Sequence, residues 1–295
     1  MRLPDIKGFL ALFFLALLAM APAGAQERMS AAADPAAARG FLADIAELYR
    51  QQRGREVDIV AGSSRSVVRA VIDGDADFGA LARPPIAMSA AEAGLTFQPV
   101  AWDAVVVIVH RDNPILNLTL KQAAAIFRGE ITSWQPLGAG SGDIHVITVT
   151  GDERDGLEHV FTQMVLRGGA GIRPTRSVAD SAAVEEAVAA DRNAIGITSY
   201  GSARRVMAVK MLGIEGRPAA VNSIRDGSYL LYTPLYLVSQ PGGAQRRLVS
   251  DLTRFSTLGS TAQVLRRVGI IPYTDGMGLL SGQTNRDAEI ERRLR

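Results

Sequence analysis

The spacing of apolar residues along this chain changes between a helical and an extended period. Apolar residues recur every three to four positions over Pro35–Gln51, which predicts a helix with Asp34 as its N-cap and Pro35 in the first turn. We expect the folded part of the chain to open with this helix. Short apolar runs bounded by Gly, Asp or Pro predict strands instead. These runs are Val57–Val60, Asp77–Ala82, Ala104–His110, Ile144–Val149 and Ala194–Thr198.

Helical patterns stand between these strands. They cover Val67–Ile72, a segment after Asn113-Pro114, Leu157–Leu166, Ala182–Ala190 and Arg246–Arg267. Residues Tyr229–Val238 alternate like a strand pair interrupted by Pro234, and Pro218–Gly227 resembles a linker. Strands that alternate with helices at this spacing favour an α/β fold with a parallel, doubly wound sheet.

The first 25 residues have the pattern of a secretory signal peptide. Arg2 and Lys7 precede the apolar run Phe9–Met20, and Ala23-Gly24-Ala25 has the small-x-small form of a cleavage site. The run is short for a membrane span, although an uncleaved anchor is the alternative. We therefore expect cleavage after Ala25 and a secreted mature chain that begins at Gln26.

Composition excludes several classes of function. The 295 residues include no Cys, which removes disulfides, thiolate metal sites and Cys nucleophiles. A mature chain of about 270 residues can bury its own core without such links. The net charge is +2, with no basic stripe that would indicate nucleic-acid binding. His110, His145 and His159 lack metal-ligand spacing, and neither G-x-S-x-G nor a Ser-His-Asp set is present. We expect no metal, no cofactor and no enzymatic activity.

A motif in Ala101–Gly138 carries a family resemblance. Its residues are Asp103, Asn113, Pro114, Leu118, Thr119, Gln122, Ile126, Phe127, Gly129, Ile131, Thr132 and Trp134. Their order resembles the phosphate-binding, periplasmic solute-receptor family. Further matches are the N-x-I-G-I strand at Asn193–Ile197 and the residues Gly227, Tyr229, Pro234, Leu235 and Tyr236. The resemblance covers about Val57 to Pro272.

This resemblance implies the type II periplasmic-binding-protein fold, an α/β fold of two lobes. Each lobe is a doubly wound sheet, and two crossing strands join them around a ligand cleft. Lobe 1 would comprise 26–108 and 228–295, and lobe 2 would comprise 109–227, with hinges near Ile108 and Gly227. The implied function is capture of phosphate or a related small oxyanion in the periplasm. The implied partner is the inner-membrane permease of an ABC importer, and we expect the receptor to be a monomer.

The first loop expected at the cleft is Gly62-Ser63-Ser64-Arg65-Ser66, between a strand and a helix. Backbone N–H groups at a helix N-terminus and adjacent hydroxyls can hold an anion. In the resembled family, a G-S-S loop at this place donates to phosphate. The alternative is that Ser63, Ser64 or Ser66 only caps the helix.

Two further loops depart from the family pattern. Relatives carry S-S-R or S-D where this chain has Leu81-Ala82-Arg83, so only the Arg is kept, as a cleft charge or a surface residue. In the third loop, R-x-x-x-S-G-T becomes Gly151 to Leu157, which keeps Gly156. Arg154 is expected to supply the lost guanidinium. The predicted ligand-binding residues are Ser63, Ser64, Arg65, Arg83, Arg154 and Gly156.

The same departures leave a second hypothesis open. Carboxylates at Asp152, Glu153 and Asp155 would repel a dianion at the third loop. The fold would then serve a sensory or protein-interaction role, or bind another small ligand such as an organic acid. Convergence of Arg65, Arg83 and Arg154 on one cleft would favour the oxyanion receptor.

Overall fold

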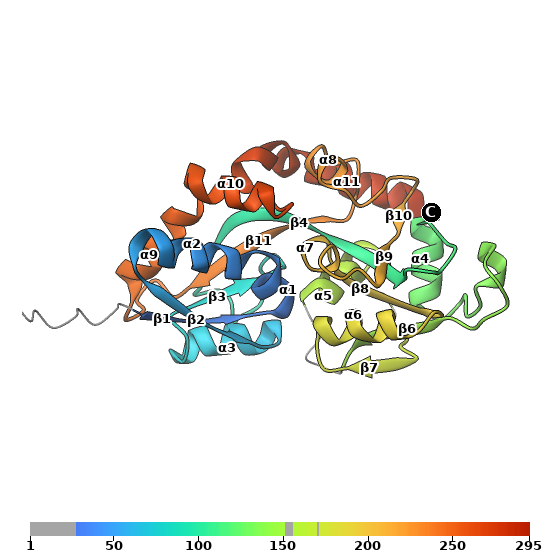
Figure 1. Ribbon diagram of the computed structural model, residues 1–295, viewed down its shortest axis with the longest axis horizontal. Helices are drawn as coiled ribbons and strands as arrows, with labels where there is room; N and C mark the ends of the chain where they lie inside the picture. The colour runs from blue at the N-terminus through green and yellow to red at the C-terminus, as the bar shows by residue number, and fades with distance from the viewer. Residues whose placement is uncertain (1–27, 151–155, 170) are drawn as a thin grey trace, which may run out of the picture.

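The computed structural model describes residues 28–150, 156–169 and 171–295 (Figure 1). The predicted signal peptide, its cleavage site after Ala25 and the loop residue Arg154 lie outside the described residues. Among the helices that are described, none is both long and apolar enough to cross a bilayer.

A mixed sheet runs through the molecule in the order β2-β1-β3-β11-β4-β8-β6-β7, with β9 and β12 also paired to β4. Its strands are β1 (Arg28–Ala33), β2 (Glu56–Ala61), β3 (Phe78–Leu81), β4 (Thr96–His110), β6 (His145–Val149), β7 (Arg176–Val178), β8 (Ala194–Ser199), β9 (Val209–Met211), β11 (Tyr232–Ser239) and β12 (Ile271–Pro272). A separate pair joins β5 (Asn117–Leu118) to β10 (Gly213–Ile214). β1 pairs in parallel with β2 and β3, and β6 with β7 and β8, which confirms the predicted α/β arrangement.

Strand β4 connects the two halves of the molecule (Figure 1). Residues 96–104 pair with β11, whereas residues 105–109 pair with β8. The change of partner falls between Ala104 and Val105, and the strand is buried from Val100 to Val109. β4 is therefore a crossing strand, as expected. The proposed lobe boundaries near Ile108 and Gly227 stay a prediction.

Helices cover both faces of the sheet. They are α1 (Pro35–Ala37), the π-helical turn η1 (Ala38–Leu42), α2 (Ala43–Arg53), α3 (Ser64–Asp73), α4 (Leu120–Phe127), η2 (Gln135–Leu137), α5 (Gly156–Met164), α6 (Ser181–Ala190), α7 (Tyr200–Ala203), α8 (Val221–Arg225), α9 (Arg246–Ser256), α10 (Gly259–Arg267), η4 (Tyr273–Gly276) and α11 (Met277–Leu294). Asp34 caps α1 as predicted, and Gly74, at φ +80°, ends α3. Thr119 and Gln122 form a capping box on α4.

Two predictions of secondary structure were wrong, and two features were not foreseen. The described chain opens with β1, not with the helix at Pro35. Tyr229–Val238 contributes one strand, β11, in which Pro234 pairs with Trp102 instead of ending the strand. The helical prediction for Arg246–Arg267 is confirmed, but the region divides into two helices because the chain turns at Thr257 and Leu258. Helix α11 was not predicted, and Figure 1 shows it reaching the C-terminus beside α4.

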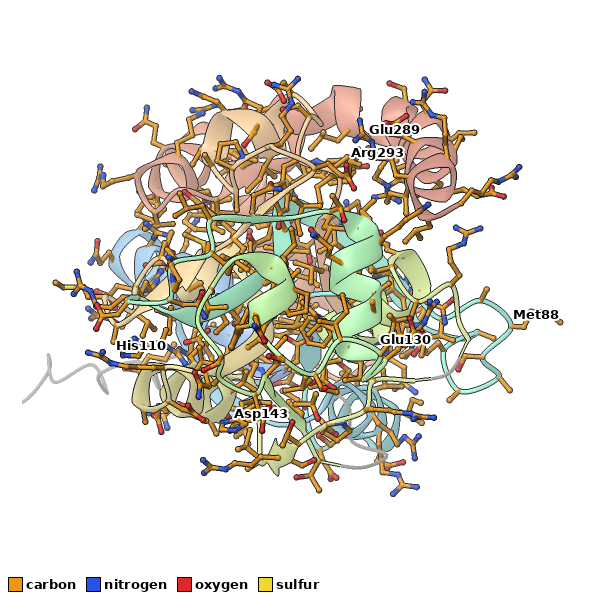
Figure 2. All side chains as sticks on the ribbon, turned by 90° about the vertical axis from the view of Figure 1, so that its right-hand side faces the viewer. Met88, His110, Glu130, Asp143, Glu289 and Arg293 are labelled. Atoms are coloured by element: carbon orange, nitrogen blue, oxygen red, sulfur yellow. The ribbon has the colours of Figure 1, made fainter. Side chains whose placement is uncertain are left out.

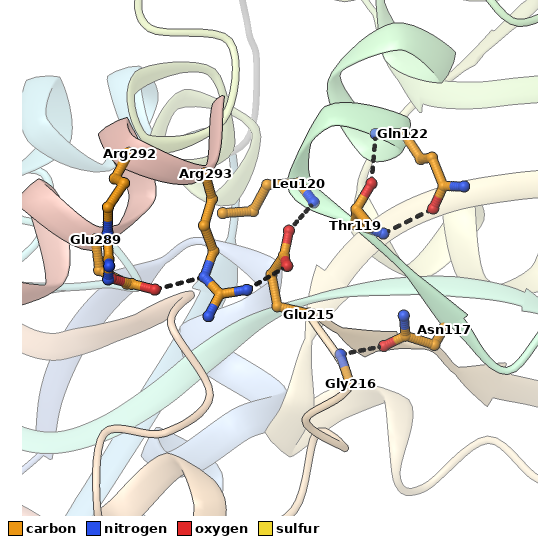
Figure 3. Close-up of polar contacts among 9 residues, drawn as sticks. All are labelled: Asn117, Thr119, Leu120, Gln122, Glu215, Gly216, Glu289, Arg292 and Arg293. Atoms are coloured by element: carbon orange, nitrogen blue, oxygen red, sulfur yellow. Dashed lines mark hydrogen bonds and ion pairs between the residues drawn. The ribbon is translucent and has the colours of Figure 1, made fainter. Parts of the chain in front are cut away.

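The loop after β10 joins α11 to α4. Glu215, at φ +54°, accepts the Leu120 N–H at 2.7 Å and pairs with Arg293 Nη1 at 2.5 Å (Figure 3). Arg293 also pairs with Glu289, which lies beside it on α11 (Figure 2). One carboxylate thus holds the start of α4 and the end of α11.

Replacing Glu215 by alanine should lower the free energy of unfolding by about 1–2 kcal/mol. The Leu120 N–H would lose its acceptor, and Arg293 would lose one of its two carboxylates. Urea unfolding measures the loss. Glu47→Ala is the control, because Glu47 pairs with Arg50 on the exposed face of α2, so its replacement should lower the free energy of unfolding clearly less. Equal losses in the two variants would contradict the bridging role of Glu215.

Candidate functional site

The carboxyl ends of β1, β2 and β3 meet at Asp34. This side chain is 0% exposed and accepts hydrogen bonds from three segments. The Ala37 N–H donates to Oδ1 at 2.8 Å, the Ala82 N–H donates to Oδ2 at 2.8 Å, and Ser64 Oγ donates to Oδ2 at 3.3 Å. Loops after parallel strands are the usual place for a ligand in α/β sheets. In this chain the Asp34 carboxylate is hydrogen-bonded to each of these three loops.

The serine loop is built as the start of α3. Ser63 caps α3 by accepting the Ser66 N–H at 3.2 Å, and a ligand role for Ser63 stays a prediction. Gly62 donates its N–H to the Ala33 carbonyl, which fixes the loop against β1. Ser64 is buried and donates to Asp34, whereas Arg65 is exposed. The loop therefore directs Ser63 and Ser64 in different directions.

Arg83 is buried in an ion pair. Its Nη2 lies 2.7 Å from Glu92 Oε1, its Nη1 lies 3.3 Å from Glu92 Oε2, and Nη1 also donates to the Pro84 carbonyl. The Arg83 and Glu92 side chains are 3% and 5% exposed, and Glu92 also accepts the Ile86 N–H at 2.7 Å. The guanidinium thus has acceptors within its own loop. A ligand role for Arg83 stays a prediction.

The start of α5, in the other half of the molecule, lies against Ser64 and Arg83. A Cβ added at Gly156 would lie 2.8 Å from Ser64 Oγ and 3.0 Å from Arg83 Cγ. Glycine is the residue that permits this approach. Three predicted site residues, Ser64, Arg83 and Gly156, are therefore neighbours. Arg154 lies outside the described residues, so its convergence with Arg65 and Arg83 stays a prediction.

Two cavities adjoin these residues. A small one of about 160 Å³ is lined by Pro35, Ala61, Gly62, Ser63, Val149, Ala179 and Asp180. A larger one of about 710 Å³ has Ser64, Arg65, Arg83, Glu92, Gly156 and His159 among its lining residues. Each cavity takes residues from the β1–β3 side and from the β6–α5–α6 side. The expected cleft between the halves thus has two hollows, and Ser63 and Ser64 face different ones.

The charges around the cavities are mixed. Asp180 lines the small cavity and caps α6 by accepting the Ala183 N–H at 2.9 Å. In the larger cavity, burial and the nearby Arg83 cation lower the pKa of His159, so its imidazole is neutral at pH 7. Within the described ranges no group of three His, Asp or Glu residues could hold a metal. The described side chains are suited to hydrogen bonding of a small solute.

Asp34 is the residue at the centre of the candidate site that sequence reasoning did not include, because it was interpreted only as a helix cap. The sequence did contain a signal that places Asp34 at the same edge of the sheet as the serine loop. Asp34 directly follows a strand and precedes a helix, as Gly62 does. That signal depends on recognising β1, whose sequence is rich in Ala.

Comparisons with known proteins identify the family of this chain and agree with its α/β fold. A family model described as a PBP superfamily domain matches residues 20–258. Phosphate-binding protein PstS 2 of Streptococcus agalactiae is 31% identical over 94 residues, and the match spans about a third of either protein, 32% of each. Phosphate-binding protein PstS of Pseudomonas aeruginosa is 25% identical over 261 residues, covering 78% of this chain and 80% of that protein.

A solved structure extends the comparison to the fold. A Clostridium perfringens protein assigned as a phosphate ABC transporter substrate-binding protein, with bound phosphate, superposes with a TM-score of 0.76. It is 20% identical and covers 83% of this chain and 99% of its own. The likeness confirms the predicted two-lobed fold.

Proposed function

Because this chain belongs to the PBP superfamily, we propose that it captures a small oxyanion and delivers it to an ABC importer in the inner membrane. The observation that carries the proposal is the small cavity where strand-end loops of both halves meet. Gly62 and Ser63 line it from one side, and Val149 and Asp180 from the other. Its volume of about 160 Å³ is well below the roughly 300–1,000 Å³ of pockets for drug-sized ligands, so a small solute suits it.

Phosphate is the first ligand to consider, since the related proteins are named phosphate-binding proteins. The proposed ligand-binding residues are Ser63, Ser64, Arg65, Arg83, Arg154 and Gly156. Closure would be a hinge motion about β4, which is shared by both halves. We further propose export by the signal peptide, cleavage after Ala25, and a monomeric receptor in the periplasm.

A second candidate function is supported by the contacts of Asp34 and Arg83. Ser64 Oγ and the Ala82 N–H already donate to Asp34, and the Arg83 guanidinium is already paired with Glu92. Groups expected to bind an anion therefore have partners within the protein. This favours a sensory or protein-interaction module, or a receptor for another small ligand.

Calorimetric titration of residues 26–295 at low salt tests the proposal, with phosphate, sulfate, molybdate and small organic acids as ligands. We expect micromolar or tighter binding of one oxyanion and at least tenfold weaker binding by Ser63→Ala. Thr119→Ala is the matched control, because it also removes a helix N-cap but lies on α4, whose residues do not line either cavity. Binding of no anion would reject the receptor and favour the second candidate.

A further inference from the structure

Helix α9 carries exposed arginines on a part of the molecule that lies away from both cavities of the cleft (Figure 1). Arg246, Arg247 and Arg254, here called the α9 arginines, are all exposed, and their spacing places them on one side of the helix. None of the three forms an ion pair with a residue in the described parts of the chain. The α9 arginines therefore present uncompensated positive charge to solvent.

The acidic residues of this region are already paired with other arginines. Asp251 is the only acidic residue of α9, and its Oδ2 lies 2.9 Å from Arg55 Nη1. At the start of the sheet, Arg28 pairs with both Glu56 and Asp58. Each of these carboxylates thus has a cation of its own, and the charge of the α9 arginines remains in excess.

A cavity of about 760 Å³ opens between the α9 arginines and Arg55. The loop 242–245 forms part of its wall and carries no charged side chain, and Asp251 lines it where it pairs with Arg55. Guanidinium groups bind phosphate oxygens strongly, often through two parallel hydrogen bonds. The cavity and the arginines around it are therefore suited to the phosphate headgroup of a lipid.

The described chain enters the fold at the same surface. β1 begins at Arg28, which is paired in register with Glu56 of β2, and Glu56 directly follows Arg55. Only residues 21–27 separate Arg28 from the apolar run Phe9–Met20 of the predicted signal peptide. Since an extended residue spans at most about 3.5 Å, that segment reaches at most about 25 Å. A precursor whose signal peptide lies in the membrane therefore holds this surface close to the lipid headgroups.

We propose that the α9 arginines dock this surface on an anionic phospholipid membrane. Each basic residue near such a membrane strengthens binding about fivefold, so three arginines give a gain of up to about a hundredfold at low salt. The surface adjoins the amino ends of β1 and β2, whereas the cavities of the cleft adjoin the carboxyl ends of these strands. Docking therefore leaves the cleft open, and it does not depend on which solute the cleft binds.

Co-sedimentation with vesicles tests the proposal. The chain used is 26–295, because the apolar run before it would insert into lipid by itself. The vesicles contain equal parts of phosphatidylglycerol and phosphatidylcholine, or phosphatidylcholine alone. One variant combines Arg246→Gln, Arg247→Gln and Arg254→Gln.

The matched control removes the same net charge elsewhere. It combines Arg173→Gln, Arg217→Gln and Arg225→Gln, which are exposed, lie outside α9 and form no ion pair with a described residue. A loss that depends only on the total charge of the protein would be equal in the two variants.

We expect the wild type to bind the phosphatidylglycerol vesicles at low salt, with binding that weakens as salt is added. Loss of the α9 arginines should weaken binding at least tenfold, and the control should stay within about threefold of the wild type. If circular dichroism shows that the α9 variant is unfolded, Arg246→Gln combined with Arg247→Gln replaces it. No binding by the wild type, equal binding to phosphatidylcholine alone, or equal losses in the two variants overturns the proposal. Calorimetric titration of the α9 variant with phosphate should match that of the wild type, so this result is independent of the receptor function.

Discussion

Replacing Arg83 by methionine should lower the free energy of unfolding by about 3–5 kcal/mol. Glu92 would remain buried with the Ile86 N–H as a donor, but without the two guanidinium contacts. Removing one partner of a buried ion pair is costly because the remaining charge stays desolvated. Urea unfolding of the mature chain measures the loss.

Two further variants separate the ion pair from other effects of the substitution. Arg83→Met combined with Glu92→Gln removes both charges, and the amide oxygen can still accept the Ile86 N–H, so at least half of the loss should be recovered. Arg266→Met removes the exposed, two-contact pair of Arg266 with Asp275 and should lower the free energy of unfolding far less than Arg83→Met. A loss at Arg83 no larger than that at Arg266 would contradict a structural role and favour the predicted ligand role.

The α/β class could be predicted from apolar spacing, whereas the two-lobed fold was predicted from the family resemblance. The errors of the prediction have physical causes. β1 was missed because Ala31, Ala32 and Ala33 carry little strand propensity, yet these small side chains are buried in a strand paired with both β2 and β3. Helix α11 was missed because only Leu279 and Ile290 are fully buried along its 18 residues. The ion pairs of α11 with the β10 loop depend on contacts between distant segments.

The candidate site could be predicted only in part. The serine loop and Gly156 were located from the family resemblance, and the structure brings Ser64, Arg83 and Gly156 together. The partner of Arg83 could not be foreseen, because Glu92 lies in an irregular loop without a periodic pattern. The central position of Asp34 follows from the pairing of β1 between β2 and β3, which brings Asp34 beside Ser64 and Ala82.

Asp103 gives the second large prediction, a dependence of stability on pH. Its buried carboxylate lies in β4 and accepts the N–H groups of Ala104 and Gly201. A Cβ added at Gly40 would lie 3.7 Å from Oδ2, and one at Gly201 would lie 3.0 Å from it. Asp103 thus packs between η1 and α7, beside the point where β4 changes partner.

Burial raises the pKa of Asp103 to about 6, although the two N–H groups, Ser199 and the Arg204 cation oppose the shift. Below pH about 4 the carboxyl is protonated in both states, and its titration contributes nothing. Between pH 4 and 6 the unfolded chain releases the proton and the folded chain retains it, so stability falls as pH rises. As the pH rises further above 6, the folded carboxyl ionises too and the loss levels off at about 3 kcal/mol.

Asp103→Asn should remove this dependence. The free energy of unfolding of the variant minus that of the wild type should rise by about 2 kcal/mol from pH 4 to pH 7, whatever constant offset the amide introduces. Urea unfolding at pH 4, 5, 6 and 7 measures the difference. In Asp275→Asn the difference should stay nearly flat over this window, because the hydrogen bonds from Arg266 lower the pKa of Asp275 and move its titration below it. A flat difference for Asp103→Asn would show that this carboxylate is already ionised at pH 4, and that its donors outweigh the cost of burial.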